Sequence, residues 1–304
     1  MSIDRTLILK GPAKIVYDTA TIFSEDDIQV DFITDYLEVM TSAFGQVGRR
    51  VKSRRIEVSL TPKMWTDLTK LYPYATAQIG TVLFGATDKP LVITPSSGAP
   101  ITLANAAVSQ LPAITLSHGK PMLRAMKFTA LCANSGDPAT QASWFSFGTA
   151  ATGVALTTFD LTKVFNTRYS CLWNAVTYRS EEGFAIDFNL GLAPDVVDGE
   201  GIVNYRITGL DAALKFVPTA KTEAEYATLL GWAKAPGASP VLSDAVLTGE
   251  GTGAPIITLA NCQVVQGGTR YGPSVNRHGE IELQSVRSIT TGALTALWTF
   301  TAIA

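Results

Sequence analysis

Histidine and cysteine, the side chains most often used for acid–base or metal chemistry, are scarce in this chain. His118 and His278 are its only histidines, and neither has cysteine or carboxylate neighbours at the spacing of a metal site or a catalytic pair. Cys132, Cys171 and Cys262 form no Cys-x-x-Cys motif. We interpret both histidines as surface-loop residues, and we predict no metal site and no catalytic residues.

Two acidic clusters are the next candidates: Glu25, Asp26 and Asp27, and, 156 residues later, Glu181 and Glu182. Paired carboxylates can perform acid–base catalysis or hold Ca²⁺. Acids that follow a serine between two strands are more simply explained as a polar turn. Their equivalence suggests another use, because copies arranged around an axis would place negative charge at one radius, along a lumen or its rim.

The glycine-rich segments show no sign of nucleotide or hydrolase chemistry. Neither 45–48 nor 249–253 continues into the Lys-Ser/Thr pair of a phosphate-binding loop. The sequence also lacks the Gly-x-Ser-x-Gly elbow of a nucleophilic serine. We therefore predict a protein that is not an enzyme and uses no cofactor.

One segment is strongly basic. It begins at Phe44 and carries five cations, at Arg49, Arg50, Lys52, Arg54 and Arg55. The equivalent segment 200–207 keeps only Arg206. We interpret 44–55 as a projecting loop or hairpin. Nucleic acid is one possible partner, but the interleaved aromatics of a single-strand binder are missing, so an acidic neighbouring subunit fits at least as well.

The composition describes a folded chain with a partly covered surface. Of its 304 residues 46% are hydrophobic and only 16% are charged, with a net charge of −2. A solitary soluble protein usually carries nearer a quarter charged residues, so we expect other subunits to cover part of the surface. The charge excludes a protein coated in basic residues to hold DNA. No run of 18 apolar residues and no signal-peptide core appear, so we expect no membrane span. The odd, sparse set of three cysteines leads us to expect reduced thiols in a cytoplasmic setting rather than a disulfide scaffold.

An internal repeat organises the sequence. Residues 101–110 and 257–266 are identical at seven of ten positions, including the shared run Ile-Thr-Leu-Ala-Asn. The same offset of 156 aligns further residues in order, and Trp144 aligns with Trp298 after a two-residue deletion. We predict two tandem modules, 1–155 and 156–304, joined by a small-residue linker at 148–153.

Strand patterns dominate both modules. Segments 56–60, 185–190 and 280–286 alternate apolar and polar residues, as half-buried strands do. One helix is expected in each module, beginning at the matched prolines Pro62 and Pro218. The predicted class is α+β and mainly β, with two β-sandwich or split-barrel modules that each carry one flanking helix.

This order of elements resembles the tail-tube proteins of long-tailed phages: a β-rich start, a long charged loop, a strand, a helix and further strands. The runs at 101–106 and 298–302 look similar to major tail proteins of this type, and the duplication to subunits that contain two modules. The resemblance implies a structural protein in which three chains form a pseudo-sixfold ring. The rings would stack into a tube through which DNA passes without specific binding.

The resemblance also implies partners and a location. We expect self-association, contacts with tape-measure, terminator and distal tail proteins, and assembly in the host cytoplasm into the virion tail. Segment 44–55 would be the loop that reaches the adjacent ring, and 200–207 its shortened counterpart. Two alternatives stay open: another β-rich virion ring protein, such as a tail terminator, distal tail or decoration protein, and a tandem β-sandwich that binds or hydrolyses glycans.

The basic segment generates a first prediction. If its five cations dock onto the next ring, reversing their charge will leave trimeric rings intact and abolish tubes, because only the stacking contact loses its attraction. Electron microscopy and sizing chromatography measure the two assembly levels separately. Unimpaired tube growth would reject this role.

Overall fold

The computed structural model describes most of the chain. The described residues are 10–24, 26–85, 87–117, 123–132, 144–149, 151–152, 168–197, 201–219, 222–231, 235–251, 254–271, 276–287, 289–290 and 293–301.

The first half of the chain folds into one antiparallel sheet with the strand order β3-β4-β9-β7-β6-β1-β2-β5. Two short strands extend it, since β10 pairs with β7 and β11 pairs with β6. The strands are β1 (Lys10–Tyr17), β2 (Ala20–Ser24), β3 (Gln29–Thr41), β4 (Gly45–Leu60), β5 (Pro62–Trp65), β6 (Lys89–Gly98), β7 (Ile101–Gln110), β9 (Met126–Leu131), β10 (Phe145–Phe147) and β11 (Ala151–Thr152).

The second half forms a sheet with the order β13-β12-β16-β17-β20-β15-β14-β8, and β23 pairs with β17. Two hairpins, β18–β19 and β21–β22, stand apart from it in the described structure. The strands are β8 (Ile114–Leu116), β12 (Tyr169–Trp173), β13 (Val176–Tyr178), β14 (Ser180–Val197), β15 (Gly201–Pro218), β16 (Ser243–Gly249), β17 (Ile256–Gln266), β18 (Thr269–Tyr271), β19 (Asn276–His278), β20 (Ile281–Ser285), β21 (Ile289–Thr290), β22 (Ala293–Leu294) and β23 (Trp298–Thr301).

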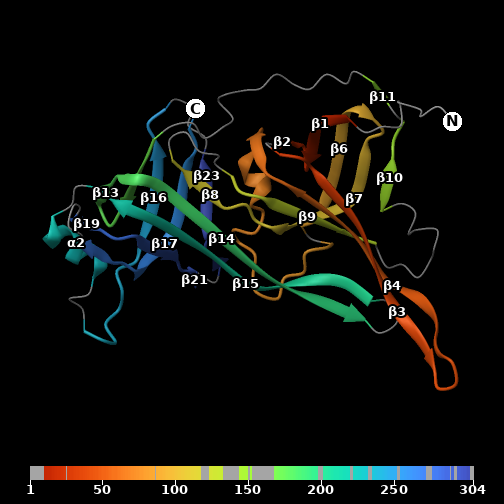
Figure 1. Cartoon of the computed structure of the whole chain (residues 1–304). Coiled ribbons are helices and arrows are strands. Elements are labelled where there is room, and N and C mark those ends of the chain that lie inside the picture. The colour runs from red at the N-terminus through yellow and green to blue at the C-terminus, as the bar shows by residue number, and fades with distance from the viewer. Residues whose placement is uncertain are drawn as a thin grey trace.

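The two sheets repeat one strand order, and they repeat its irregularities. Hairpin β3–β4 has bulges at Asp35/Tyr36 and Val39/Met40, and hairpin β14–β15 has them 156 residues later, at Gly191/Leu192 and Asp195/Val196. A bulge adds one residue to a strand and turns it locally, so matched bulges mean matched strand paths. Figure 1 shows the two sheets side by side. The expected α+β, mainly β class with two β-rich modules is confirmed, since each half of the chain builds an antiparallel sheet.

The predicted starting points of the two helices were wrong. Pro62 begins strand β5, at the edge of the sheet, where its missing N–H costs no ladder bond. Among its described residues, the first half has only a 3-10 turn, η2 (Leu68–Leu71), and it ends at Tyr72 because Pro73 follows. Pro218 ends strand β15.

Helix α2 (Glu223–Leu230) begins shortly after the strand, behind a capping box. The Glu225 carboxylate accepts from the N–H of Thr222, and the Thr222 hydroxyl accepts from the N–H of Glu225. This Thr-x-x-Glu pattern was the start signal that the sequence carried.

The alignment of Trp144 with Trp298 was one residue out. The Trp144 carbonyl accepts from the N–H of Ala104, and the N–H of the equivalent Ala260 donates instead to Leu297 O. Phe145 and Phe147 face Leu103 and Ile101 across the ladder, as Trp298 and Phe300 face Leu259 and Ile257. Trp298 therefore matches Phe145, and Phe300 matches Phe147.

One strand joins the halves directly. Strand β8, from the first half, pairs with β14 of the second through Ile114↔Ile186 and Leu116↔Phe184. Gly183 makes this approach possible, because a Cβ there would lie 2.5 Å from Leu116 O, and its φ of +92° suits glycine. Residues of the predicted first module thus complete the second sheet.

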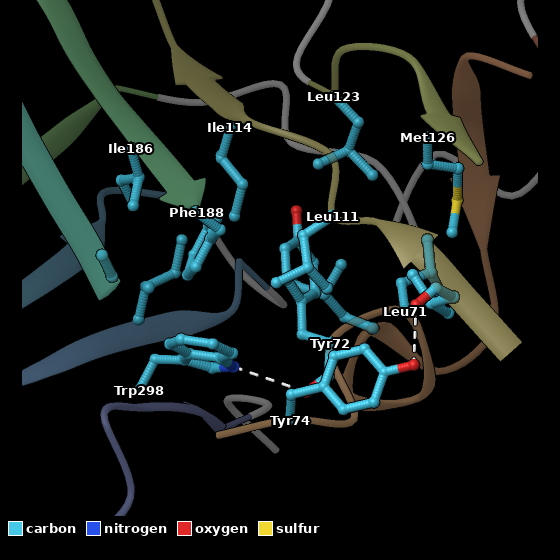
Figure 2. Packing of buried hydrophobic residues seen from close by; sticks show 14 of the residues in the cluster. Leu71, Tyr72, Tyr74, Leu111, Ile114, Leu123, Met126, Ile186, Phe188 and Trp298 are labelled. Carbon is cyan, nitrogen blue, oxygen red and sulfur yellow. Dashed lines mark hydrogen bonds between the residues drawn. The ribbon is translucent and has the colours of Figure 1, made fainter. Parts of the chain in front are cut away.

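Aromatic side chains fill the joint between the halves. The Tyr72 ring packs on Phe188, with ring centroids 4.6 Å apart, and on Phe300, at 4.9 Å. The Trp298 indole packs edge-on against Phe188 at 4.9 Å and donates its N–H to Tyr72 O at 3.4 Å. Figure 2 shows Trp298, Phe188 and Tyr72 gathered with Leu111 and Ile114 in one buried cluster. The two sheets therefore share a hydrophobic core.

Trp298 yields a prediction about stability. Trp298→Ala removes a side chain that is only 2% exposed and opens a cavity in the shared core. We expect a loss of about 3–5 kcal/mol in the free energy of unfolding, measured by urea denaturation. Phe147→Ala, on the strand equivalent to β23 but 60% exposed, should change it by less than about 1 kcal/mol. Equal losses in the two variants would contradict the shared core.

Candidate functional site

The basic segment lies in a long hairpin. Phe44, 84% exposed, lies in the turn between β3 and β4, and the cations from Arg49 to Arg55 lie within strand β4. The expectation of a shortened counterpart at 200–207 was wrong, because β14 and β15 have 18 residues each. Both hairpins project from their sheets, and β14–β15 extends toward β3–β4 (Figure 1).

An ion-pair network holds the base of hairpin β3–β4. Arg55 bonds to Asp35 at 2.6 Å and to Glu57 at 3.1 Å, and Lys127 bonds to Glu57 at 2.9 Å. A hydrogen bond from Ser53 is the largest cause of the lowered pKa of Asp35, and Arg55 adds to it. Burial raises the pKa of Glu57, but hydrogen bonds from Lys127 and Arg55 outweigh it, so this pKa is also lowered.

The network changes the interpretation of the basic segment. Arg55 is neutralised inside its own chain, so reversing its charge would disturb the hairpin as well as any docking contact. Arg49 lies 3.6 Å from Glu38 in an exposed pair, which contributes little. Arg50, Lys52 and Arg54 are exposed and form no ion pair within the described residues. These three cations are the ones available to a partner.

The second half carries a similar polar surface on the equivalent strands. Lys215 bonds to Asp187 at 3.0 Å, which is the largest cause of the raised pKa of Lys215. Asn189 donates to Asp211 at 2.7 Å. The alternate residues of these strands, Ile186, Phe188, Ala212 and Leu214, are buried in the core. We call this surface the polar face; in the two halves it comprises Asp35, Arg55, Glu57, Lys127, Asp187, Asn189, Asp211, Lys215 and Glu282.

The described residues of the acidic clusters lie at the N-terminal ends of strands β3 and β14. Asp26 and Asp27 are exposed in the link before β3, and Glu182 is exposed at the start of β14. Glu25 and the side chain of Glu181 lie outside the described residues. The position at the head of two equivalent strands is compatible with the expected charge at one radius, which remains a prediction.

Hairpin β3–β4 and β10 also expose apolar surface. Phe32 is 53% exposed and Phe147 60%, and both pack against Phe145. We call these three residues the aromatic patch. Further along the hairpin the exposed apolar side chains are Tyr36, Leu37, Met40, Phe44, Val47 and Val51. So much exposed apolar surface along one hairpin marks an interaction site.

The structure brings together no constellation for catalysis or metal binding among the described residues, where no group of three His, Cys, Asp or Glu could hold a metal ion. His118 lies outside those residues. His278 was expected in a surface loop, but it ends strand β19, half-buried, and stacks on Tyr226 with centroids 4.1 Å apart. Burial raises the pKa of the Cys171 thiol above its ordinary range, which makes it unreactive. None of the described helices is both long and apolar enough to cross a bilayer.

Comparisons with known proteins leave the chain without an assigned family. No protein-family model matches it, and no curated protein resembles it at a significant level.

Sequence reasoning missed most of the site. Asp35, Glu57 and Lys127 lie on strands in which apolar and polar residues alternate. This pattern predicts half-buried strands, but it does not predict which charged side chains pair across the sheet. For the aromatic patch, the sequence showed only that Phe32 aligns with Phe188. What the alignment could not show is that one copy is buried and the other exposed.

The ion-pair network predicts an acid-sensitive stability. A carboxyl whose pKa is lowered by folding stabilises the protein above its ordinary pKa, and that stability is lost as the pH falls through the folded value. We expect the unfolding free energy to fall between about pH 5 and pH 3. Glu57→Gln should cost about 1–3 kcal/mol at pH 7 and flatten this decline. Glu38→Gln, in an exposed pair, is the control; two indistinguishable urea-unfolding profiles would refute the role of Glu57.

Proposed function

We propose that the protein is a structural subunit of a phage-type tail tube, in which three chains form a pseudo-sixfold ring and rings stack into a hollow conduit for DNA. The observation that carries the proposal is the contact between the halves. Residues 72–84 and strand β8 of the first half contact strands β14, β15 and β23 of the second half. Two equivalent sheets thus meet through different surfaces.

Such a contact is heterologous and repeats. When similar units join through two different surfaces, each joint leaves one surface of each kind unused at the ends, and further copies add until a ring closes or a filament grows. In this chain the unused pair is the β3–β4 and β10 side of the first half and the α2 side of the second. Three chains of two units each would give six positions around an axis.

The polar face suits the lining of a DNA channel. Each phosphate that a protein neutralises adds salt-dependent affinity, which would hold DNA in place. On this face Arg55, Lys127 and Lys215 are each bonded to carboxylates of the same chain. DNA would therefore meet paired charges and polar groups rather than free cations. The protein would act without catalysis and without a cofactor.

The other proposed partners follow from the same arrangement. Hairpin β3–β4 would reach the adjacent ring through Arg50, Lys52 and Arg54, whose charges are exposed. The ends of such a tube would meet terminator and distal tail proteins, and its lumen would enclose a tape-measure protein. Assembly would take place in the host cytoplasm before the tail joins the virion.

Electron microscopy of the purified chain, with its mass measured by light scattering, tests the proposal. We expect trimeric rings and, at high concentration, tubes of varied length. Closed rings that never stack would favour a terminator, distal tail or decoration protein instead. A chain that stays monomeric under all assembly conditions would contradict the proposal.

A carbohydrate-binding module is the second candidate, and the aromatic patch is the observation that favours it. Exposed rings can stack on sugar faces, and Phe32, Tyr36 and Phe147 are all more than half exposed. A glycan array distinguishes the two functions. Binding of one glycan class by a monomeric chain would support this candidate over a tube subunit.

A further inference from the structure

The aromatic patch has a counterpart in the second half that is already covered. Phe32 lies 156 positions before Phe188, and Phe145 and Phe147 occupy the ladder positions of Trp298 and Phe300. The ring arrangement is repeated too, since Phe32 lies 6.4 Å from Phe147 and Phe188 lies 6.4 Å from Phe300. Phe188 is only 6% exposed and Phe32 is 53% exposed.

The covering element is a segment of the first half, residues 72–84, which we call the clasp. At its start Tyr72 packs on Phe188 and Phe300. Further on, backbone hydrogen bonds join it to β15, from Gly80 N to Ile207 O, from Ile207 N to Thr81 O and from Leu83 N to Tyr205 O. The clasp therefore covers an aromatic cluster and adds a short strand to a sheet edge.

A corresponding segment in the second half begins at the same place in the fold. Tyr72 donates its hydroxyl to Pro112 O, and Tyr226 donates its hydroxyl to Gly268 O, 156 positions after Pro112. The described stretch that follows helix α2, residues 235–240, is exposed throughout, and Leu242 beside it is 51% exposed. Within the described part of a single chain, this segment covers no aromatic cluster of the other half. Helix α2 and the patch lie at opposite ends of the molecule (Figure 1).

We propose that the aromatic patch of one copy is the docking site for residues 235–242 of a second copy, in a head-to-tail contact that repeats the edge pairing of the clasp, while Tyr226, the counterpart of Tyr72, stays stacked on His278 of its own half. The stretch of β4 at Arg49–Val51 pairs with β3 and has no second ladder partner among the described residues, although Gly201 approaches the next residue, Lys52. It corresponds to the stretch of β15 that the clasp pairs with, because Val51 matches Ile207 in register. Residues 235–242 of the second copy would thus contact both the aromatic patch and the edge of strand β4. This inference rests on the proposed function and names the surfaces that would close its ring.

The two kinds of joint would not be equally strong. Within the chain Trp298 donates an N–H to Tyr72 O, whereas the phenyl ring of Phe145 carries no donor at the equivalent position. Strand β8 also adds hydrogen bonds at Phe184 that depend on Gly183, and the equivalent residue in the first half is Asp27. The contact between chains would depend on apolar burial and would be the weaker one.

Cross-linking tests the contact without requiring a loss of folding. In a Phe147→Cys/Ala238→Cys chain, a short bismaleimide should link separate copies into dimers and closed trimers. The control pair Phe147→Cys/Leu172→Cys keeps one site and moves the other to an exposed strand residue. We expect at least about a tenfold higher yield from the first pair. Equal yields would overturn the docking site.

A substitution tests the energetics. Phe32→Glu should weaken self-association by about 10- to 30-fold, as loss of an interface anchor does, while Leu172→Glu should not; circular dichroism checks that both fold. If wild-type rings form and Phe32→Glu assembles equally well, the docking site is wrong and the ring function stands. If the wild type never self-associates, both fail. A polysaccharide that binds a monomer through Phe32 would also overturn the proposal.

Discussion

The structure depends on burying Tyr72 between two sheets. Its hydroxyl donates to Pro112 O inside the first half, while its ring packs on Phe188 and Phe300 of the second. Burial raises the pKa of this hydroxyl far above its ordinary value, so it stays a donor at any physiological pH. The clasp begins at this side chain and pairs with β15, and strand β8 of the first half pairs with β14. Both contacts hold the first half against the second. The two halves consequently share one hydrophobic core, despite their repeated topology.

The fold was predictable where local patterns are strong. Alternation in β4, β14 and β20 predicted strands because a half-buried strand needs a period of two. The helix starts failed because proline at a strand edge and proline at a helix start look alike in sequence, and only pairing with β2 decides for Pro62. The offset of 156 predicted equivalent positions well, since both hairpins keep their bulges.

The site was less predictable because it depends on contacts between distant residues. Five cations close together suggested one docking loop, but Arg55 meets Asp35 and Glu57 across the sheet and is neutralised. Equivalence could not show that Phe188 is covered and Phe32 is not, because the covering clasp comes from the other half. An internal repeat predicts which strands are equivalent. Which of their surfaces stay exposed depends on how the two halves pack together.

The exchange of β8 has a mechanical consequence. Because strand β8 of the first half belongs to the sheet of the second, bending the chain at its middle would break the β8–β14 ladder, whereas the proposed contact between chains includes no exchanged strand of this kind. A closed assembly of three such chains would therefore alternate stiff and compliant joints. If such a ring widened to admit cargo, it would open at the three contacts between chains. The ring would then deform with threefold symmetry, even though its outline is hexagonal.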